Sequence, residues 1–345
     1  MKYTTLPNTE IKVSEICLGT MTFGEQNSES EGHAQMDYAF EKGINFFDTA
    51  EMYSVPGRKE TYGSTEKIIG TWFKKTGNRS EIFLASKIAG PNPGLSYIRE
   101  NMDFSPASIA LSIDKSLSRL QTDYIDLYQL HWPERKTNFF GQRGFKVQED
   151  SWEDSIHLVL ETLDSFIKQG KINHIGLSNE TPWGIMRFLE ESKYHNLPKI
   201  KTIQNPYSLL NRLFETGSSE ICMRENVGLL AYSPLAFGVL SGKYLQGASH
   251  PQARLSLFPQ FSRYNSTQCA EATRLYHDIA TKNGLSLTEM ALAFVNQQAF
   301  VTSNIIGATT LEQLKENIAS IEVVLSDEII KEINGVQALI PDPAP

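Results

Sequence analysis

The chain has 345 residues, of which 40% are hydrophobic and 21% are charged, and its formal net charge is −8 at pH 7. This composition is typical of a globular protein with a sizeable core, and the acidic balance argues against general nucleic-acid binding, which needs a basic surface. No apolar run is long enough to cross a membrane, and the first residues lack a signal-peptide pattern. We therefore expect a soluble, cytoplasmic protein without nucleic-acid or membrane partners. No pattern in the sequence indicates an oligomeric state.

Short apolar runs, many of them β-branched, alternate along the chain with stretches patterned as helices. A Pro-Asn turn between YTTL at 3–6 and EIKV at 10–13 predicts a β-hairpin ahead of the first main strand. Eight further strands are predicted at 16–18, 45–48, 82–86, 125–130, 172–177, 200–204, 229–232 and 304–306. Near-continuous apolar runs suit parallel strands that are buried on both faces. The alternation predicts an α/β fold, a (β/α)8 TIM barrel with the hairpin at its bottom.

Helix start signals lie between these strands. Ser105 and Thr181 each stand before a proline, which places an N-cap residue ahead of proline at the first helical position. Two residue pairs have the spacing of a capping box: Ser286 with Glu289, and Thr310 with Gln313. No linker divides the chain, so we predict one domain over 1–345, with a core at about 3–336 and a short tail at 337–345.

Three connections are longer than strand-to-helix loops usually are: 54–63, 132–150 and 236–265. Each follows a predicted strand and precedes a predicted helix. In a barrel this places all three at the C-terminal face, where TIM-barrel active sites lie.

Four polar residues stand at or just after the ends of the second, third and fourth barrel strands: Asp48, Tyr53, Lys87 and His131. These strands are neighbours in a barrel, so we expect the side chains to converge. The Lys87 ammonium would lower the pKa of Tyr53 from its usual value near about 10, making the phenol a better general acid. Asp48 would hold Lys87, and His131 would donate a hydrogen bond to a substrate oxygen. Such a set protonates a carbonyl oxygen while a hydride reaches the carbon.

Other interpretations of these residues exist. Asp48 and Lys87 could form a structural ion pair beneath the loops, and His131 could be merely hydrogen-bonded. Lys87 could also be a Schiff-base nucleophile in an aldolase-like enzyme. No metal site is predicted, because His131 has no second ligand at metal-binding spacing. The three cysteines are too few and too far apart for a disulfide framework or a zinc ribbon.

The string FFDTAEMY around Asp48 and Tyr53 resembles the signature of the aldo-keto reductases. Six further strings follow in the order found in that family and are similar to it: LASK, LYQLHWP, IGLSNET, IQNPYSLLNR, LLAYSPLAFGVLSGKY and IIGATTLEQLKENI. The resemblance runs from about residue 3 to residue 336. It is closest to the bacterial Tas-type branch, which is similar to the potassium-channel β-subunits. It implies a carbonyl reductase in which Asp48, Tyr53, Lys87 and His131 form the catalytic tetrad.

One departure from the family pattern concerns the tyrosine. The family usually has glycine directly after it and a glutamate soon afterwards, whereas here Ser54 follows Tyr53 and a similar YGSTE begins only at Tyr62. We assign Tyr53 as the proton donor because its spacing from Asp48 is kept, and we interpret the extra residues as an insertion. Tyr62 is the rival.

The sequence also predicts a phosphate site. Gly307–Thr310 follow the last strand and lead directly into a helix, whose free N–H groups favour an anion. No G-x-G-x-x-G follows the first strand, so a Rossmann domain is not indicated. The resemblance implies NADPH, held by Thr20, Met21, Asp48, Ser178, Asn179, Gln204, Tyr232, Ser233, Pro234, Leu235, Ala236, Gly238, Lys243, Arg254, Gly307, Thr309, Gln313, Glu316 and Asn317. We expect NADPH over NADH from Thr309 and Arg254, because Lys315 would point elsewhere on its helix.

The expected substrate is a small carbonyl compound, with an apolar or aromatic body because aromatic residues occur in the loops after several strands. The candidates for this wall are Phe23, Trp132, Phe139, Phe140 and Tyr207, although such rings could equally pack the loops together. The likeness to channel β-subunits leaves one alternative open: an NADP(H)-binding regulatory protein with slow turnover.

Overall fold

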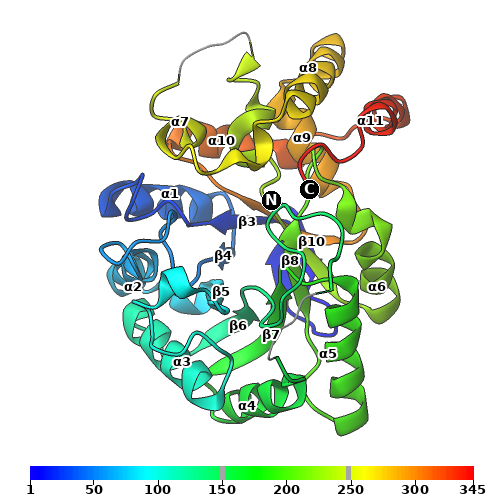
Figure 1. Ribbon diagram of the computed structural model, residues 1–345. Helices are drawn as coiled ribbons and strands as arrows, with labels where there is room; N and C mark the ends of the chain where they lie inside the picture. The colour runs from blue at the N-terminus through cyan, green and yellow to red at the C-terminus, as the bar shows by residue number, and fades with distance from the viewer. Residues whose placement is uncertain (148–151, 246–249) are drawn as a thin grey trace.

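Eight parallel strands close into a barrel surrounded by helices, which is the predicted TIM barrel (Figure 1). The computed structural model describes residues 1–147, 152–245 and 250–345. The barrel strands are β3 (Ile16–Gly19), β4 (Phe46–Asp48), β5 (Phe83–Ile88), β6 (Ile125–Leu130), β7 (Ile172–Ser178), β8 (Thr202–Pro206), β9 (Gly228–Tyr232) and β10 (Val301–Ile306). Each overlaps a predicted strand. β10 pairs with β3, with Asn304 opposite Ile16, and so closes the ring.

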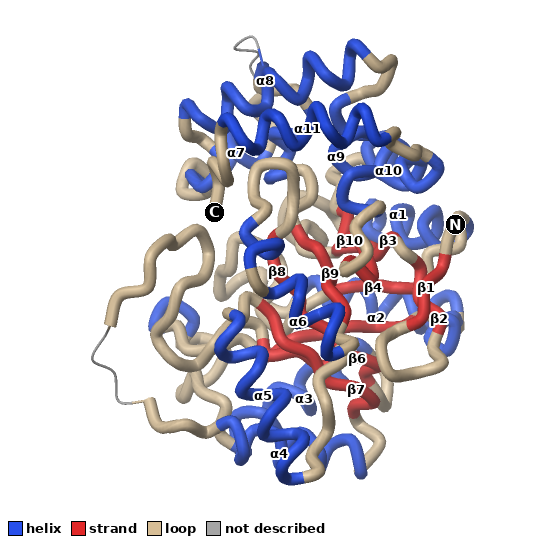
Figure 2. Tube along the Cα trace, turned by 90° about the vertical axis from the view of Figure 1, so that its right-hand side faces the viewer, coloured by secondary structure: helices blue, strands red, loops and turns tan. Residues whose placement is uncertain are grey.

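The predicted hairpin is also present. β1 (Tyr3–Thr5) and β2 (Lys12–Ser14) pair in antiparallel fashion. Leu6 and Val13 pack into the same apolar cluster as Phe46 and Phe83 of the barrel strands. Figure 2 shows the hairpin at one end of the barrel strands and the last residues of the chain at the other. The hairpin therefore covers the end of the barrel that does not carry the site.

Helices follow the strands around the outside of the barrel. They are α1 (Glu29–Glu41), α2 (Ser64–Thr76), α3 (Pro106–Leu120), α4 (Ile156–Lys168), α5 (Pro182–His195), α6 (Ser218–Glu225), α7 (Arg254–Leu257), α8 (Thr267–Lys282), α9 (Leu287–Asn296), α10 (Leu311–Ala319) and α11 (Asp327–Leu339). α11 extends past residue 336, where we had placed the end of the core. No helix in the described ranges is long and apolar enough to cross a membrane.

The helix caps agree with the sequence at three of four positions. Ser105 and Thr181 accept hydrogen bonds at the starts of α3 and α5, and Ser286 forms a capping box at α9. Of the two hydrogen bonds of the capping box predicted at Thr310, one is present and the other is not. Thr310 caps α10, but the Gln313 side chain accepts from Thr309 rather than from the cap residue.

The predicted long loops lie after β4, β6 and β9. Residues 148–150 of the second loop and 246–249 of the third lie outside the described residues. The remaining parts contribute residues to a single large cleft at the C-terminal ends of the strands. The loop lengths therefore predicted correctly which face of the barrel carries the cleft.

Candidate active site

The four polar residues predicted from the strand ends lie together. Lys87, near the end of β5, has its Nζ 2.7 Å from Asp48 Oδ2 and 3.4 Å from the Tyr53 hydroxyl oxygen. Nζ also donates to the carbonyl oxygen of Thr49 at 2.7 Å. The ring of His131 lies edge-on to the ring of Tyr53, with centroids 5.7 Å apart. The end of the barrel thus brings a phenol, an ammonium, a carboxylate and an imidazole into one group.

Burial governs the acidity of Tyr53. We expected the Lys87 ammonium to bring the pKa of this phenol below its usual value. Instead, burial raises the pKa of Tyr53, and the positive charges of Lys87 and Arg254 only partly oppose that rise. Burial alone would also lower the pKa of Lys87, but the neighbouring Asp48 and Tyr53 oxygens raise it, which keeps the ammonium charged. Tyr53 therefore carries its proton at neutral pH.

His131 follows β6 and faces the cleft. Burial, with the nearby charge of Lys87, lowers the pKa of this imidazole well below its usual value. The ring is therefore neutral at pH 7 and has one N–H to donate. Its Nδ1 atom is buried without a hydrogen-bond partner in the described part of the chain.

Asp48 has two further partners inside the barrel. Gln204 of β8 donates to Asp48 Oδ1 at 2.8 Å, and Gln129 of β6 donates to the same oxygen at 3.4 Å. Both amides therefore hold the Asp48 carboxylate in position inside the barrel. Sequence reasoning missed Gln129. The available signal was a polar residue in an otherwise apolar strand, two positions before His131 and so on the same side of the strand.

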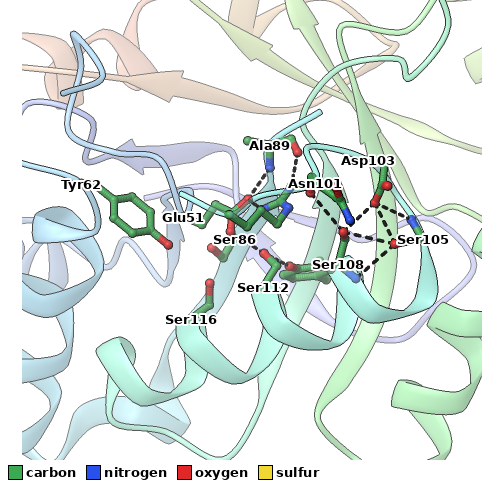
Figure 3. A network of polar contacts seen from close by, with 12 residues as sticks. Glu51, Tyr62, Ser86, Ala89, Asn101, Asp103, Ser105, Ser108, Ser112 and Ser116 are labelled. Carbon is green, nitrogen blue, oxygen red and sulfur yellow. Dashed lines mark hydrogen bonds and ion pairs between the residues drawn. The ribbon is translucent and has the colours of Figure 1, made fainter. Parts of the chain in front are cut away.

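A second buried carboxylate, Glu51, lies between Asp48 and Tyr53 in the chain (Figure 3). Its Oε1 accepts from the Ala89 backbone N–H at 2.7 Å and pairs with Arg99, and its Oε2 accepts from Ser112 at 2.6 Å. Both members of the ion pair are almost fully buried. Glu51 thus ties the segment that carries Tyr53 to the end of β5 that carries Lys87. The sequence offered no signal for this contact beyond the glutamate itself.

The rival tyrosine lies outside the cleft. The Tyr62 hydroxyl accepts a hydrogen bond from Arg119 at 3.1 Å, and its ring packs against Tyr97. Glu66, the glutamate of the YGSTE string, pairs with Arg119 at 2.7 Å and accepts from Ser86. This part of the sequence therefore forms a polar cluster between α2 and α3, beneath the loops.

A cleft of about 1130 Å³ opens above the tetrad. This exceeds the usual size of a pocket for one small ligand and leaves room for a dinucleotide beside a substrate. Of the predicted cofactor residues, those that line it are Thr20, Met21, Asp48, Ser178, Asn179, Gln204, Tyr232, Ser233, Pro234, Leu235, Gly238, Lys243, Arg254, Gly307, Thr309, Gln313, Glu316 and Asn317. Ala236 does not: its small side chain is fully buried in the core.

Two cations stand along the part of the cleft formed by the loop after β9. Burial lowers the pKa of Arg254 to about 10, and burial together with Arg254 lowers the pKa of Lys243. Arg254 lies over the Phe237 ring and contacts the sulfur of Met21 at 3.7 Å. Neither cation has a carboxylate partner among the described residues. Partly buried cations that lack an internal counter-ion suit the phosphates of a dinucleotide.

The loop between β10 and α10 forms another part of the rim of the cleft. Asn317 donates to the Gly307 carbonyl oxygen at 3.1 Å, and the Gln313 side chain holds Thr309. Near the tetrad, Asn179 accepts from the Tyr232 hydroxyl at 2.6 Å and donates to the His131 carbonyl oxygen at 2.8 Å. These contacts hold the residues at each end of the cleft in place.

The predicted aromatic wall is only partly correct. Trp132 and Phe140 line the cleft. Phe139 packs against Phe140 without lining it, and Phe23 is fully buried in the core. Tyr207 is also buried, bonded to Glu215. These three rings have a packing role, which is the alternative that the sequence left open for aromatic residues in these loops. Residues that we did not predict also line the cleft, among them Met52, Asn92, Leu95, Phe261 and Arg263.

A closed β/α barrel with this polar group at the C-terminal ends of its strands defines the class of protein. Residues 15–338 match the aldo/keto reductase family, and the chain belongs to that family. Membership supports carbonyl reduction as the general type of activity.

Three relatives illustrate how closely the chain resembles known members. It is 50% identical to protein tas of Escherichia coli (strain K12), over the whole length of both chains. It is 33% identical to an uncharacterized oxidoreductase, YrpG, of Bacillus subtilis (strain 168), over 97% of this chain and 96% of that one. It is 30% identical to the aldo-keto reductase yakc [NADP(+)] of Schizosaccharomyces pombe, over 92% of this chain and 85% of that one.

Proposed function

We propose that this protein is an NADPH-dependent reductase that converts aldehydes or ketones to alcohols, with Tyr53 as the general acid. The observation that carries the proposal is the position of the Tyr53 hydroxyl, 3.4 Å from the Lys87 ammonium at the base of a large cleft. A nicotinamide cofactor, when bound, supplies the hydride. The residues of the chain supply the proton and the binding energy.

Each residue of the tetrad has its own role in the proton transfer. Tyr53 keeps its proton until a substrate oxygen gains negative charge beside it. Lys87 then stabilises the phenolate that the proton leaves behind, and Asp48 holds Lys87 in place at 2.7 Å. His131, being neutral, donates its single N–H to the same substrate oxygen. Trp132 and Phe140 give the substrate side an aromatic surface, which favours apolar or aromatic carbonyl compounds.

The preference for NADPH rests on charge. Arg254 and Lys243 are partly buried cations that line the cleft, and the extra phosphate of NADPH adds an anion that they can pair with. Thr309 supports the same end of the cofactor with its hydroxyl. The relative from Schizosaccharomyces pombe carries NADP(+) in its name, which agrees with this choice.

The test is an NADPH-oxidation assay over a panel of aldehydes and ketones, with Tyr53→Phe as the inactive control. Reduction of at least one compound by the wild-type protein, lost in Tyr53→Phe, supports the proposal. Trapping of a substrate on Lys87 by borohydride without NADPH consumption would instead support an aldolase-like enzyme.

The second candidate is an NADP(H)-binding regulatory protein with slow turnover. The burial that raises the pKa of Tyr53 favours it, because it makes this phenol a weaker acid than the free side chain. Tight cofactor binding with negligible reduction across the panel would support this alternative. In either case we propose one domain that works in the cytoplasm, and the three buried free thiols Cys17, Cys222 and Cys269 agree with a reducing setting.

A further inference from the structure

Outside the cleft, two histidines and a glutamate meet on the outer surface of the barrel. His157 lies in the first turn of α4, and Glu191 and His195 lie one turn apart near the end of α5. One ligand atom from each residue, a ring nitrogen of each histidine and a carboxylate oxygen of Glu191, can be chosen so that all three atoms lie within 4.8 Å of one another. α4 and α5 are adjacent helices in both views of the molecule (Figures 1 and 2). The cluster therefore spans two elements that are separate in the sequence.

We propose that His157, Glu191 and His195 form a binding site for a divalent transition-metal ion, with Zn²⁺ as the best fit. Glu191 Oε1 lies 2.8 Å from His157 Nδ1 and 3.1 Å from His195 Nε2. Tetrahedral Zn²⁺ with bonds of about 2.0–2.1 Å holds its ligand atoms about 3.3 Å apart. To surround one ion, the two glutamate contacts would lengthen by a few tenths of an ångström, and the histidine nitrogens, now within 4.8 Å of each other, would also adopt a separation of about 3.3 Å. Water would complete the coordination.

The surroundings of the cluster also resemble a metal site. His157 directs its other ring nitrogen, Nε2, at Glu161 Oε1, 3.3 Å away. A carboxylate on the second nitrogen of a histidine fixes the tautomer that leaves the first nitrogen free to bind a metal. Arg187 pairs with Glu191 Oε2 at 2.7 Å and with Asp154 at 3.0 Å. Arg187 thus holds the carboxylate by one oxygen and leaves the other directed at the histidines.

The charge balance favours a cation. Within residues 1–147, 152–245 and 250–345, the carboxylates that form ion pairs with the cluster or its arginine are Glu191, Glu161 and Asp154, against the one guanidinium of Arg187. The neutral histidines that bind metal add no charge. A dication would offset the two excess negative charges.

The site is accessible from solvent and held on helices. The side chains of His157 and His195 are 42% and 51% exposed, whereas that of Glu191 is 9% exposed. An ion can therefore reach the histidines without any opening of the fold. Because the ligands come from α4 and α5, a bound ion would clamp these helices together and stabilise the folded state. The site is far from the tetrad in sequence and does not depend on the proposed reductase activity.

The experiment is a titration of metal-stripped protein with Zn²⁺ in competition with a chromophoric chelator. We expect one equivalent to bind to the wild-type protein, and His157→Ala or His195→Ala to weaken binding by roughly 100-fold or more, since even second-layer substitutions cost about 10–100-fold. Glu161→Gln should weaken it about tenfold. His277→Ala, on α8 and outside the cluster, is the matched control and should bind like the wild type. Zn²⁺ should also raise the melting temperature of the wild type and of His277→Ala, but not of His157→Ala. Absence of stoichiometric binding, or equal affinity in all the variants, would overturn the proposal.

Discussion

The Lys87 ammonium lies between two acidic groups, 2.7 Å from Asp48 Oδ2 and 3.4 Å from the Tyr53 hydroxyl oxygen. The shorter contact, to a carboxylate, keeps the lysine charged, and the longer one directs that charge at the phenol. The cation therefore opposes the burial of Tyr53 without overcoming it. In the ground state the phenol remains protonated, and the benefit of Lys87 is realised only when the proton leaves.

The first prediction concerns the two tyrosines. Tyr53→Phe should lower kcat for carbonyl reduction by roughly 100- to 10,000-fold, because it removes the general acid. It should leave NADPH binding, measured by fluorescence titration, intact. Tyr62→Phe should retain wild-type turnover, since the Tyr62 hydroxyl bonds to Arg119 beneath the loops and Tyr62 does not line the cleft. The opposite pattern, with activity lost in Tyr62→Phe and kept in Tyr53→Phe, would show that our assignment is wrong.

The second prediction compares two buried glutamate–arginine pairs. Glu51→Gln and Glu66→Gln each leave a buried arginine unpaired, which should cost about 3–5 kcal/mol of stability in both cases. Only Glu51→Gln should also lower kcat, roughly 10- to 100-fold, because Glu51 positions the segment that carries Tyr53. Urea unfolding and steady-state kinetics, the latter at a temperature where both variants are folded, separate the two effects. If Glu51→Gln and Glu66→Gln lost kcat equally, the role of Glu51 would be structural only.

The third prediction tests the choice of cofactor. Arg254→Ala should raise the KM for NADPH by about 10- to 100-fold, the range expected for a hydrogen-bonded ion pair, with little change in the KM for NADH. Lys315→Ala is the control, because Lys315 lies over the Tyr38 ring and does not line the cleft. Comparable catalytic efficiency of the wild-type protein with NADH and NADPH would contradict the predicted preference.

The fourth prediction follows from the lowered pKa of His131. The unfolded chain binds a proton at this imidazole near its usual pKa of 6.5, whereas the folded protein binds it only at much lower pH. The free energy of unfolding should therefore be highest above pH 6.5 and fall as the pH decreases below that value. His131→Asn should remove this part of the acid sensitivity. Urea unfolding of both proteins between pH 8 and pH 4 measures the difference, and parallel curves would refute it.

Local pattern was enough to predict the barrel. Each strand of the ring is a short apolar run, so β-branched composition and the helix signals between strands located all eight. Contacts between distant residues were harder to foresee. Glu51 and Arg99 are separated by 48 positions and carry no motif. Likewise, an aromatic residue in a loop is equally compatible with the core and with the cleft, and for this reason Phe23 and Tyr207 were assigned to the wrong place.

The acidity of Tyr53 was misjudged for a related reason. The sequence identified the charged neighbour, Lys87, but not the depth at which the phenol is buried, and burial has the larger effect. At Thr310, the spacing of a capping box was present, but the Gln313 side chain accepts its hydrogen bond from the Thr309 backbone N–H instead of that of Thr310. In both cases the sequence identified the interacting residues correctly. Which of two competing effects or partners prevails depends on the three-dimensional structure.

The pairing of β10 with β3 joins Asn304 to Ile16, residues from opposite ends of the chain. During synthesis on the ribosome, β3 has an open edge until almost the entire polypeptide has emerged. Contacts of such large sequence separation form late and slowly. The loop after β10 also supplies one rim of the cleft, so a truncated chain would lack both ring closure and that rim. Closure of the barrel and formation of this rim therefore depend on the same segment of the chain.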